Sequence, residues 1–302
     1  MFIALTYVGL VLAVAFLVLT ERAVLGLTQI RKGPNVVGPW GMMQCVGDGV
    51  KLMTKFNIKL TPTSVMIYSF SPVSLVILVM LLISCLPMPS LIISWGSSML
   101  LLFCILGLIS LPFMLLGLCY GSTYSTVGSI RVIGLMMSYE ILMLVLMMFF
   151  KGMDGSWTWD STINGFVSPG TMASRVVFIM PMVVLWLMEL GRTPFDLAEG
   201  ESELVSGFNV EYGGWGFLLF FFSEMLALLV MSMMFSSLLL LTQSYAMKCF
   251  AMVAFVMLSL YIRSLLPRFR LMDVQAFIWF RLTPASLLVG CLGLCLSTLY
   301  HA

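Results

Sequence analysis

Long apolar runs separated by short polar segments dominate this chain. Residues 60–130 contain no Asp, Glu, Lys or Arg. About 20 apolar residues suffice to cross a bilayer, so that run alone holds two spans and a short loop. The whole pattern predicts eight spans, at about 2–19, 65–86, 98–119, 132–150, 175–190, 215–241, 246–266 and 282–300. We therefore predict an all-α polytopic membrane protein, a single transmembrane domain over residues 1–302.

The first polar segment, 21–64, is the longest predicted loop. Gly33-Pro34-Asn35 and Gly38-Pro39 are turn signals. After these turns, apolar and polar residues alternate at roughly helical spacing: Met42, Met43, Val46, Val50, Leu52 and Met53 with Gln44, Asp48, Lys51 and Lys55. That spacing predicts an amphipathic helix at the membrane surface. A solvated linker is the alternative interpretation.

Carboxylates are concentrated around the predicted loop 190–214. Six of the 13 acidic residues lie here or directly before it, with Arg192 as the only base: Glu189, Asp196, Glu199, Glu201, Glu203 and Glu211. Thr193-Pro194-Phe195-Asp196 has the residue types of a helix start, with Thr as the cap, Pro at the first position and Asp at the third. Gly200 and Gly207 would permit tight turns.

Closely spaced carboxyls repel one another when ionised, so we expect at least one pKa in this loop to be raised. Such a cluster could hold and pass protons near neutral pH. A solvated acidic loop that docks a basic partner explains the same residues equally well. Arg263, Arg268 and Arg270 could pair with this loop, or they could bind anionic lipid headgroups.

Two further carboxyls, Glu140 and Glu224, fall inside predicted spans. A carboxylate in hydrocarbon is costly, so such residues normally face a wet interior or a partner. The alternative is a protonated, hydrogen-bonded Glu with a structural role. Glu21 and Arg22 mark the end of the first apolar run. A functional role and a simple pair of charged side chains at the membrane interface explain these two residues equally well.

Composition excludes several classes of protein. The chain is 61% hydrophobic and 9% charged, whereas soluble domains carry about 25% charged residues. The only histidine is His301, and the seven cysteines include no C-x-x-C pair. These residues do not supply the usual ligands of a haem, zinc or iron–sulfur site. Any electrons would therefore come from another chain.

The positive charges indicate the orientation in the membrane. Twelve of the 15 Lys and Arg residues fall in the first, third, fifth and seventh predicted loops. Basic loops stay on the cytoplasmic or matrix side, so both termini are predicted to lie on the opposite side. We find no soluble domain and no internal repeat.

Several long motifs resemble one known family. E-R-x-x-L-G-x-x-Q-x-R-K-G-P-N-V-V-G-P-x-G begins at Glu21, and G-R-T-P-F-D-L-A-E-G-E-S-E-L-V-S-G-F-N-V-E-Y begins at Gly191. S-Y-E at 138–140 and L-P-R-F-R at 266–270 extend the match along the chain. The chain is thereby similar to the subunit 1 family of respiratory complex I, the proton-pumping NADH:ubiquinone oxidoreductase.

The resemblance implies a function that spacing alone could not supply. It implies a core subunit that forms the membrane entrance of the quinone tunnel, and an acidic relay coupling quinone reduction to proton translocation. The substrate would be ubiquinone, with NADH, FMN and the iron–sulfur clusters held by partner subunits. Those partners would be two hydrophilic quinone-site subunits, neighbouring membrane subunits and membrane lipids, with no nucleic acid. The location implied is the mitochondrial inner membrane, with both termini on the intermembrane-space side.

Roles carry over position by position. The tunnel residues implied are Glu21, Arg22, Arg31, Asp48, Glu189, Arg192 and Asp196. The relay residues implied are Glu140, Glu199, Glu201, Glu203, Glu211 and Glu224. No catalytic group and no metal ligand is implied for this chain in isolation.

Four positions depart from the family pattern. Phe56 replaces a Glu, Gly191 replaces a frequent Asn, and Leu135 replaces a Gln. After R-F-R the family has Tyr-Asp, whereas here Leu271-Met272 precede Asp273.

Three other functions remain open at this stage. The related anchor subunit of membrane-bound hydrogenases is one, although the 27 Met residues and the first-loop motif favour the respiratory enzyme. A free-standing transporter using the same carboxyls is another, although we see no broken-helix pair. A purely structural anchor is the third.

Overall fold

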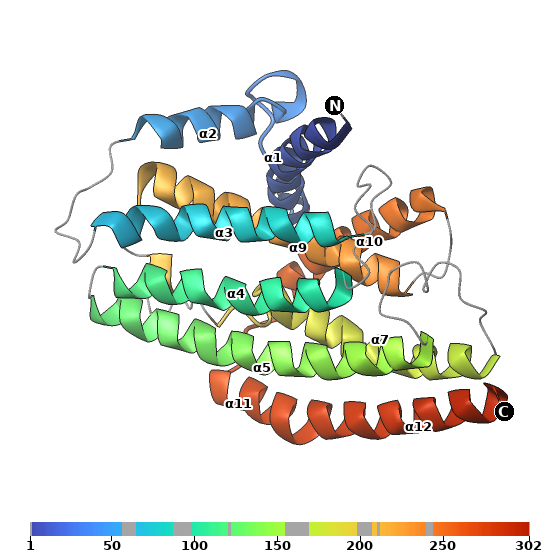
Figure 1. Cartoon of the computed structure of the whole chain (residues 1–302). Coiled ribbons are helices and arrows are strands. Elements are labelled where there is room, and N and C mark those ends of the chain that lie inside the picture. The colour runs from blue at the N-terminus through green and yellow to red at the C-terminus, as the bar shows by residue number, and fades with distance from the viewer. Residues whose placement is uncertain are drawn as a thin grey trace.

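The computed structural model describes residues 2–55, 65–86, 98–119, 122–154, 169–197, 207–209, 212–239 and 244–301, and this part of the chain contains helices but no strand. The long helices lie side by side in Figure 1. Their bounds are α1 (Phe2–Thr28), α2 (Gln44–Thr54), α3 (Val65–Cys85), α4 (Ser98–Leu118), α5 (Thr123–Asp154), α7 (Pro169–Glu189), α9 (Gly214–Leu239), α10 (Tyr245–Leu265), α11 (Leu271–Phe277) and α12 (Thr283–His301). Three short turns complete them: η1 (Pro39–Gly41), η2 (Gly207–Asn209) and the π-helical η3 (Ile278–Leu282).

The prediction of a polytopic all-α membrane protein is confirmed. Within the described residues, seven helical segments are long and apolar enough to cross a bilayer: Leu5–Thr28, Met66–Cys85, Ser98–Leu118, Thr123–Gly152, Gly214–Leu239, Ala246–Leu265 and Leu271–Cys295. The fifth predicted span corresponds to α7, whose apolar stretch Phe178–Glu189 is shorter.

Helix α9 lies at the centre of the bundle. It packs against α1, α2, α3, α7 and α10, and its residues from Leu228 to Leu238 are all buried. Its serines point into this apolar interior, where each donates a hydrogen bond to a carbonyl one turn earlier, as Ser232 does to Leu229 at 2.8 Å. The hydroxyl groups of these serines form their hydrogen bonds within α9 itself. They therefore do not indicate a polar pathway through the bundle.

A second group of helices forms around α5, which packs against α4, α7 and α12. In Figure 1 α12 lies along α5 at the edge of the bundle farthest from α2. Trp279 donates a hydrogen bond from Nε1 to Ser138 Oγ at 3.3 Å and so fixes how the two helices are aligned. The bundle therefore brings Glu140 on α5 and Glu189 at the end of α7 into one interior.

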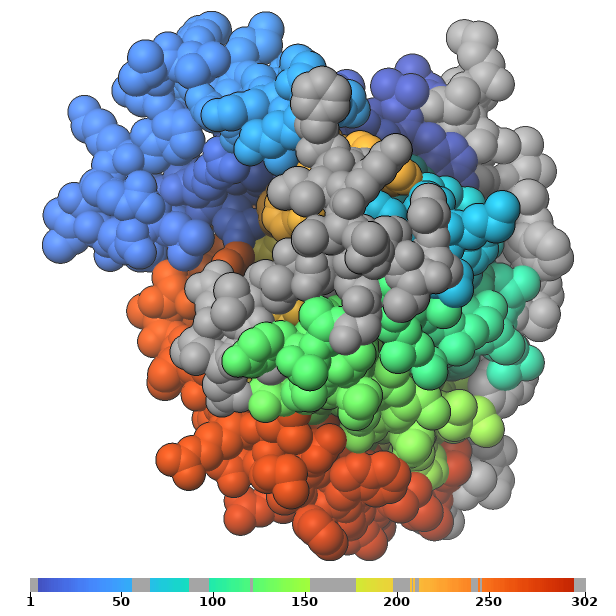
Figure 2. All heavy atoms as spheres, turned by 90° about the vertical axis from the view of Figure 1, so that its left-hand side faces the viewer, coloured from blue at the N-terminus to red at the C-terminus, as the bar shows by residue number. Residues whose placement is uncertain are grey.

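The predicted surface helix is confirmed as α2. None of its residues is buried, and Val46, Val50 and Met53 expose an apolar face. It packs on α1 and α9. In Figure 2 the first loop and α2, in blue, project beyond the rest of the bundle.

Several predicted helix boundaries are wrong: α5, for example, begins at Thr123, nine residues before the predicted start at 132. α1 continues through Glu21 and Arg22 to Thr28, so the polar loop begins eight residues later than 21. The segment 271–281 was predicted as loop, but α11 and η3 make it continuous with α12. At α1 the helix continues because the polar side chain of Glu21 finds two guanidinium partners, which an apolar-run criterion ignores.

The predicted helix start at Thr193–Asp196 is also wrong, because this segment forms turns. Thr193 does not cap the segment, since its Oγ1 donates to the carbonyl of Arg263 at 3.2 Å. Pro194 O accepts a hydrogen bond from the Phe269 amide at 3.1 Å. The end of α10 and the link to α11 thus take up the polar groups that a helix would have used.

Candidate functional site

A buried ion cluster forms where three distant segments meet. Glu21 on α1 is 6% exposed. Its Oε1 forms an ion pair with Arg192 Nη1 at 2.9 Å and also accepts a hydrogen bond from Arg263 Nη1. Arg192 comes from the turn after α7, and Arg263 comes from the last turn of α10. Removing one partner of a buried ion pair costs about 3–5 kcal/mol, so this cluster holds the three segments together.

Arg192 also connects the cluster to α9. Its Nη2 donates a hydrogen bond to Met225 Sδ at 2.8 Å. Glu224 precedes Met225 on α9, and Arg192, Glu224 and Arg263 line one small cavity of about 80 Å3. The guanidinium of Arg192 therefore lies between Glu21 and the first carboxyl inside the bundle.

Asp196 is held beside this cluster. It is 6% exposed, and its Oδ2 accepts a hydrogen bond from Arg268 Nη2 at 2.9 Å. The neighbouring Phe195 packs against Phe269, with ring centroids 5.6 Å apart. These contacts confirm that the basic segment after α10 pairs with the start of the acidic loop.

Three cavities run in sequence from the cluster into the bundle. The first, with Arg192 and Asp196, contains Glu224. The second, of about 110 Å3, is lined by both Glu224 and Glu189. The third, of about 160 Å3, is lined by both Glu189 and Glu140. Each cavity shares a carboxyl with the next, so the three glutamates form a row.

The middle carboxyl of this row is poorly satisfied. Glu189 ends α7, and its Oε2 is buried without a hydrogen-bond partner among the described residues. Such a buried acceptor costs about 1–3 kcal/mol unless water or a proton satisfies it. One water molecule needs a cavity volume of about 10–15 Å3. The cavities on the two sides of Glu189 measure about 110 and 160 Å3, so both have room for water.

Gly191 shapes the exit from α7 and lines the first two cavities. Its φ of 58° is left-handed, and its amide donates to Met188 O at 3.1 Å. Gly and Asn are the residues that most readily end a helix in this conformation. The replacement of the family's frequent Asn by Gly191 therefore keeps the backbone geometry.

The first-loop residues lie farther out. Arg22 pairs with Asp48 Oδ2 at 2.6 Å, and Gln44 Nε2 donates to Asp48 Oδ1 at 3.0 Å. The pair joins α1 to α2 but is partly exposed, so it contributes at most about 1 kcal/mol. Arg31 is exposed and donates from Nε to Gln29 at 2.9 Å, apart from the buried cluster.

A thiol lies beside this surface pair. Partial burial raises the pKa of Cys45 on α2, and the Asp48 carboxylate raises it further, whereas the Arg22 guanidinium lowers it. The thiol therefore stays protonated near neutral pH.

Several predicted residues fall outside the described part of the chain: Glu199, Glu201, Glu203, Glu211 and Phe56. Two other departures can be placed. Leu135 is 3% exposed and belongs to the apolar core. Asp273 is the third residue of α11, so its carboxylate lies in the first turn of the helix. There it interacts favourably with the helix dipole, even though it is shifted by one residue from the family's position.

The sequence reasoning missed two parts of the site. For Arg263 the acidic loop and lipid headgroups were the two alternatives, and Glu21 on α1, which its guanidinium binds, was not foreseen as a partner. Tyr139 was not singled out, yet it is 4% exposed and its hydroxyl has no hydrogen-bond partner among the described residues. Its position beside Glu140 in an apolar helix was the available signal. The described residues contain no group of three or more His, Cys, Asp or Glu that could hold a metal ion.

Fold and site together define a polytopic all-α membrane protein with a row of carboxyls between its helices. A family described as NADH dehydrogenase matches residues 1–293, and the chain belongs to this family. The chain is 36% identical over 291 residues to NADH-ubiquinone oxidoreductase chain 1 of Branchiostoma lanceolatum, covering 94% of this chain and 91% of the relative. It is 37% identical over 279 residues to the Aedes aegypti protein of the same name, covering 91% and 88%. It is 33% identical over 303 residues to that of Hylobates lar, covering 95% and 93%.

Proposed function

We propose that this chain is a membrane subunit of proton-pumping NADH:ubiquinone oxidoreductase. It forms the membrane entrance of the quinone tunnel and part of a carboxyl relay that couples quinone reduction to proton translocation. Its membership of the NADH dehydrogenase family and the names of its relatives support the enzyme. The row Glu224–Glu189–Glu140 supports the relay.

The row of cavities is the observation that carries the relay. Proton transfer between carboxyls needs short gaps bridged by water or by movement of the side chains. Glu224 and Glu189 line one cavity, and Glu189 and Glu140 line the next. Intramembrane carboxyls are costly and normally serve a pathway. Three of them facing successive cavities favour a pathway over three separate structural hydrogen bonds.

The ion cluster supplies a means of coupling. Two unit charges about 4 Å apart interact by roughly 4 kcal/mol at an effective dielectric constant of about 20. Arg192 pairs with Glu21 and lines a cavity with Glu224. A change of charge near Glu21, where reduced quinone takes up protons, would thus alter the interaction of Arg192 with Glu224.

The remaining predicted residues complete the proposal. Glu199, Glu201, Glu203 and Glu211 would carry protons between the quinone and Glu224. Arg22, Arg31 and Asp48 would form the first-loop wall of the entrance. The chain would act as one transmembrane domain, with matrix loops 21–64 and 190–214 and both termini in the intermembrane space of mitochondria. NADH, FMN and iron–sulfur clusters would belong to the hydrophilic partners.

The relay is tested by removing the proton-carrying group while keeping its shape. We expect Glu189→Gln and Glu140→Gln to lower both proton pumping and quinone reduction by at least about tenfold, because a positioned acid–base group contributes about 10²–10⁴-fold. The assembly is purified, reconstituted in vesicles and assayed for NADH-driven acidification and for ubiquinone reduction. Electron transfer from NADH to a water-soluble acceptor that bypasses quinone should not change.

The matched controls are Glu189→Asp and Glu140→Asp, which keep a titratable carboxyl and should retain most of the pumping. Normal pumping by both Gln variants in fully assembled enzyme would show that the row is structural. Loss of the bypass activity as well would point to failed assembly, which is measured separately by the content of partner subunits.

A further inference from the structure

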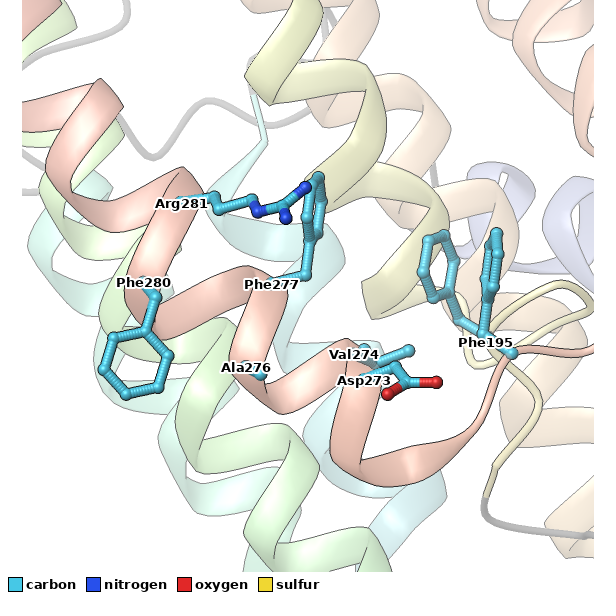
Figure 3. A pocket seen from close by; sticks show the side chains of 8 residues that line it. Phe195, Asp273, Val274, Ala276, Phe277, Phe280 and Arg281 are labelled. Carbon is cyan, nitrogen blue, oxygen red and sulfur yellow. The ribbon is translucent and has the colours of Figure 1, made fainter.

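One cavity of the described structure lies outside the carboxyl row. It measures about 610 Å3 and follows one face of α11 and η3. Figure 3 shows Asp273 at the end near Phe195, and Arg281 beside the ring of Phe277 farther along the helix. Both charged residues are exposed, and neither has a hydrogen bond or ion pair to another described residue. The cavity thus presents one acidic and one basic group on a largely apolar wall.

Arg281 lies deep in a span. The hydrogen bond from Trp279 to Ser138 places residue 279 opposite residue 138. Gly134 approaches the Gln275 side chain and Gly290 approaches Phe149, so α5 and α12 run in the same direction with a constant offset. That offset places Arg281 at the depth of Glu140, within the apolar segment Leu271–Cys295. A cation at that depth normally has a partner.

The local backbone gives a second reason to expect a ligand. Arg281 belongs to the π-helical turn η3, Ile278–Leu282. Such turns are uncommon and frequently occur at functional sites. Side chains of a helix lean toward its N-terminus, and Figure 3 shows the guanidinium beside the ring of Phe277, one turn closer to Asp273.

We propose that this cavity binds one zwitterionic phospholipid, with its ammonium group at Asp273, its phosphate at Arg281 and its acyl chains along the apolar face of α12. From water inward, such a lipid presents ammonium, then phosphate, then hydrocarbon. The helix presents an acid at its start, a base eight residues deeper and apolar residues beyond. Eight residues rise about 12 Å, and the backward reach of Arg281 shortens the gap between the two charges.

The charge order decides between lipid classes. An anionic lipid would satisfy Arg281 but would leave Asp273 unpaired beside a negative headgroup. A neutral quinone would pair with neither charge. The rings of Phe195 and Phe269 pack at a tilt and line the same cavity as Asp273, and they add faces that attract an ammonium or choline group. The proposal depends on the chain being embedded in a membrane and holds whether or not the carboxyl row carries protons.

The test uses the native assembly reconstituted with a trace of phosphatidylcholine that carries a photoreactive diazirine on one acyl chain. Illumination should label peptides of α11 and α12, located by mass spectrometry. Unlabelled phosphatidylcholine or phosphatidylethanolamine should compete at about tenfold lower mole fraction than phosphatidylglycerol with the same acyl chains. Arg281→Gln removes the charge-assisted hydrogen bond to the phosphate, so it should reduce the labelling by roughly tenfold.

Two variants sharpen the result. Asp273→Asn should bring phosphatidylglycerol to the same potency as phosphatidylcholine, because the acid that excludes it is gone. Arg270→Gln, an exposed arginine that does not line the cavity, should leave the labelling unchanged. Equal competition by phosphatidylglycerol in the unmodified chain would overturn the proposal. Absence of labelling in this segment would also overturn it and would indicate that a partner subunit covers the cavity.

Discussion

At the scale of the residue, Gly191 shows how one backbone angle fixes the approach to the carboxyl row. Its φ of 58° ends α7 and directs the chain toward Arg192. A Cβ built at this position meets no atom within 4 Å, so a substitution changes backbone strain and little else. The left-handed conformation costs an ordinary L-residue about 1–2 kcal/mol.

We therefore expect Gly191→Ala to destabilise the chain by about 1 kcal/mol and Gly191→Asn to cost clearly less, because Asn tolerates this conformation. The measurement is thermal unfolding of the purified assembly, followed through dissociation of this chain. Equal losses from Ala and Asn would mean that side-chain contacts, and not φ, determine the cost.

The sequence identified the charged residues of the site but not their pairing. It singled out Glu21, Arg192 and Asp196 because ionisable groups are rare in this chain. It could not show that Arg263, 242 residues after Glu21, donates to that carboxyl. Only the packing of α1 against α10 brings the two together, and this packing depends on apolar surfaces that carry no residue-specific signal.

At the scale of the element, the ion pair between Arg22 on α1 and Asp48 on α2 holds α2 against α1. The pKa of the Cys45 thiol depends on both charges, so its reactivity reports on this pair. Burial and Asp48 raise the pKa of the Cys45 thiol, and Arg22 lowers it. The thiolate is the reactive form, so alkylation of Cys45 should be slow near pH 7 and should rise with pH above the usual range of a thiol. Asp48→Asn removes the negative charge and leaves Arg22, so it should lower the pKa and speed alkylation at pH 8.

The measurement is the alkylation rate of the Cys45 peptide by mass spectrometry as a function of pH. A pKa effect shifts the midpoint of the profile, whereas release of α2 raises the rate at every pH. Lys51→Gln, an exposed change on the same helix, serves as the matched control. A profile that is identical for Asp48→Asn and the unmodified chain would contradict the assigned electrostatic cause.

The apolar pattern was sufficient to predict the elements, but it placed several of their ends wrongly. Every described long helix coincides with a predicted apolar run, because burial in lipid selects both length and composition. α1 continues past its apolar run because Glu21 finds two guanidiniums. Thr193 does not start a helix because its hydroxyl donates to the Arg263 carbonyl in the last turn of α10. Tertiary contacts decided both cases, and local residue types do not reveal them.

At the scale of the whole molecule, the first loop leaves apolar surface outside the spans. Ile30, Val36 and Trp40 are 97%, 93% and 85% exposed, and they belong to the first loop, part of the blue region that projects from the bundle in Figure 2. Exposed apolar residues grouped in this way mark an interaction site. Lipid would cover the spans but not a loop that contains Arg31 and Lys32. Under the proposed function, hydrophilic partner subunits would cover this loop.

This surface leads to a prediction about the native size of the assembly. Membranes solubilised in a mild detergent, separated on a native gel and stained for NADH dehydrogenase activity, should show this chain in a very large active band. Replacing Trp40 by Ser should shift a substantial part of the chain into smaller, inactive species, because an aromatic anchor at a protein interface commonly contributes about 2 kcal/mol or more. Met66→Ser, an equally exposed apolar residue at the start of α3, is the matched control and should leave the large band intact. If the unmodified chain migrated alone, away from any active band, the proposed membership of the oxidoreductase would fail, and the carboxyl row would have to serve an independent transporter.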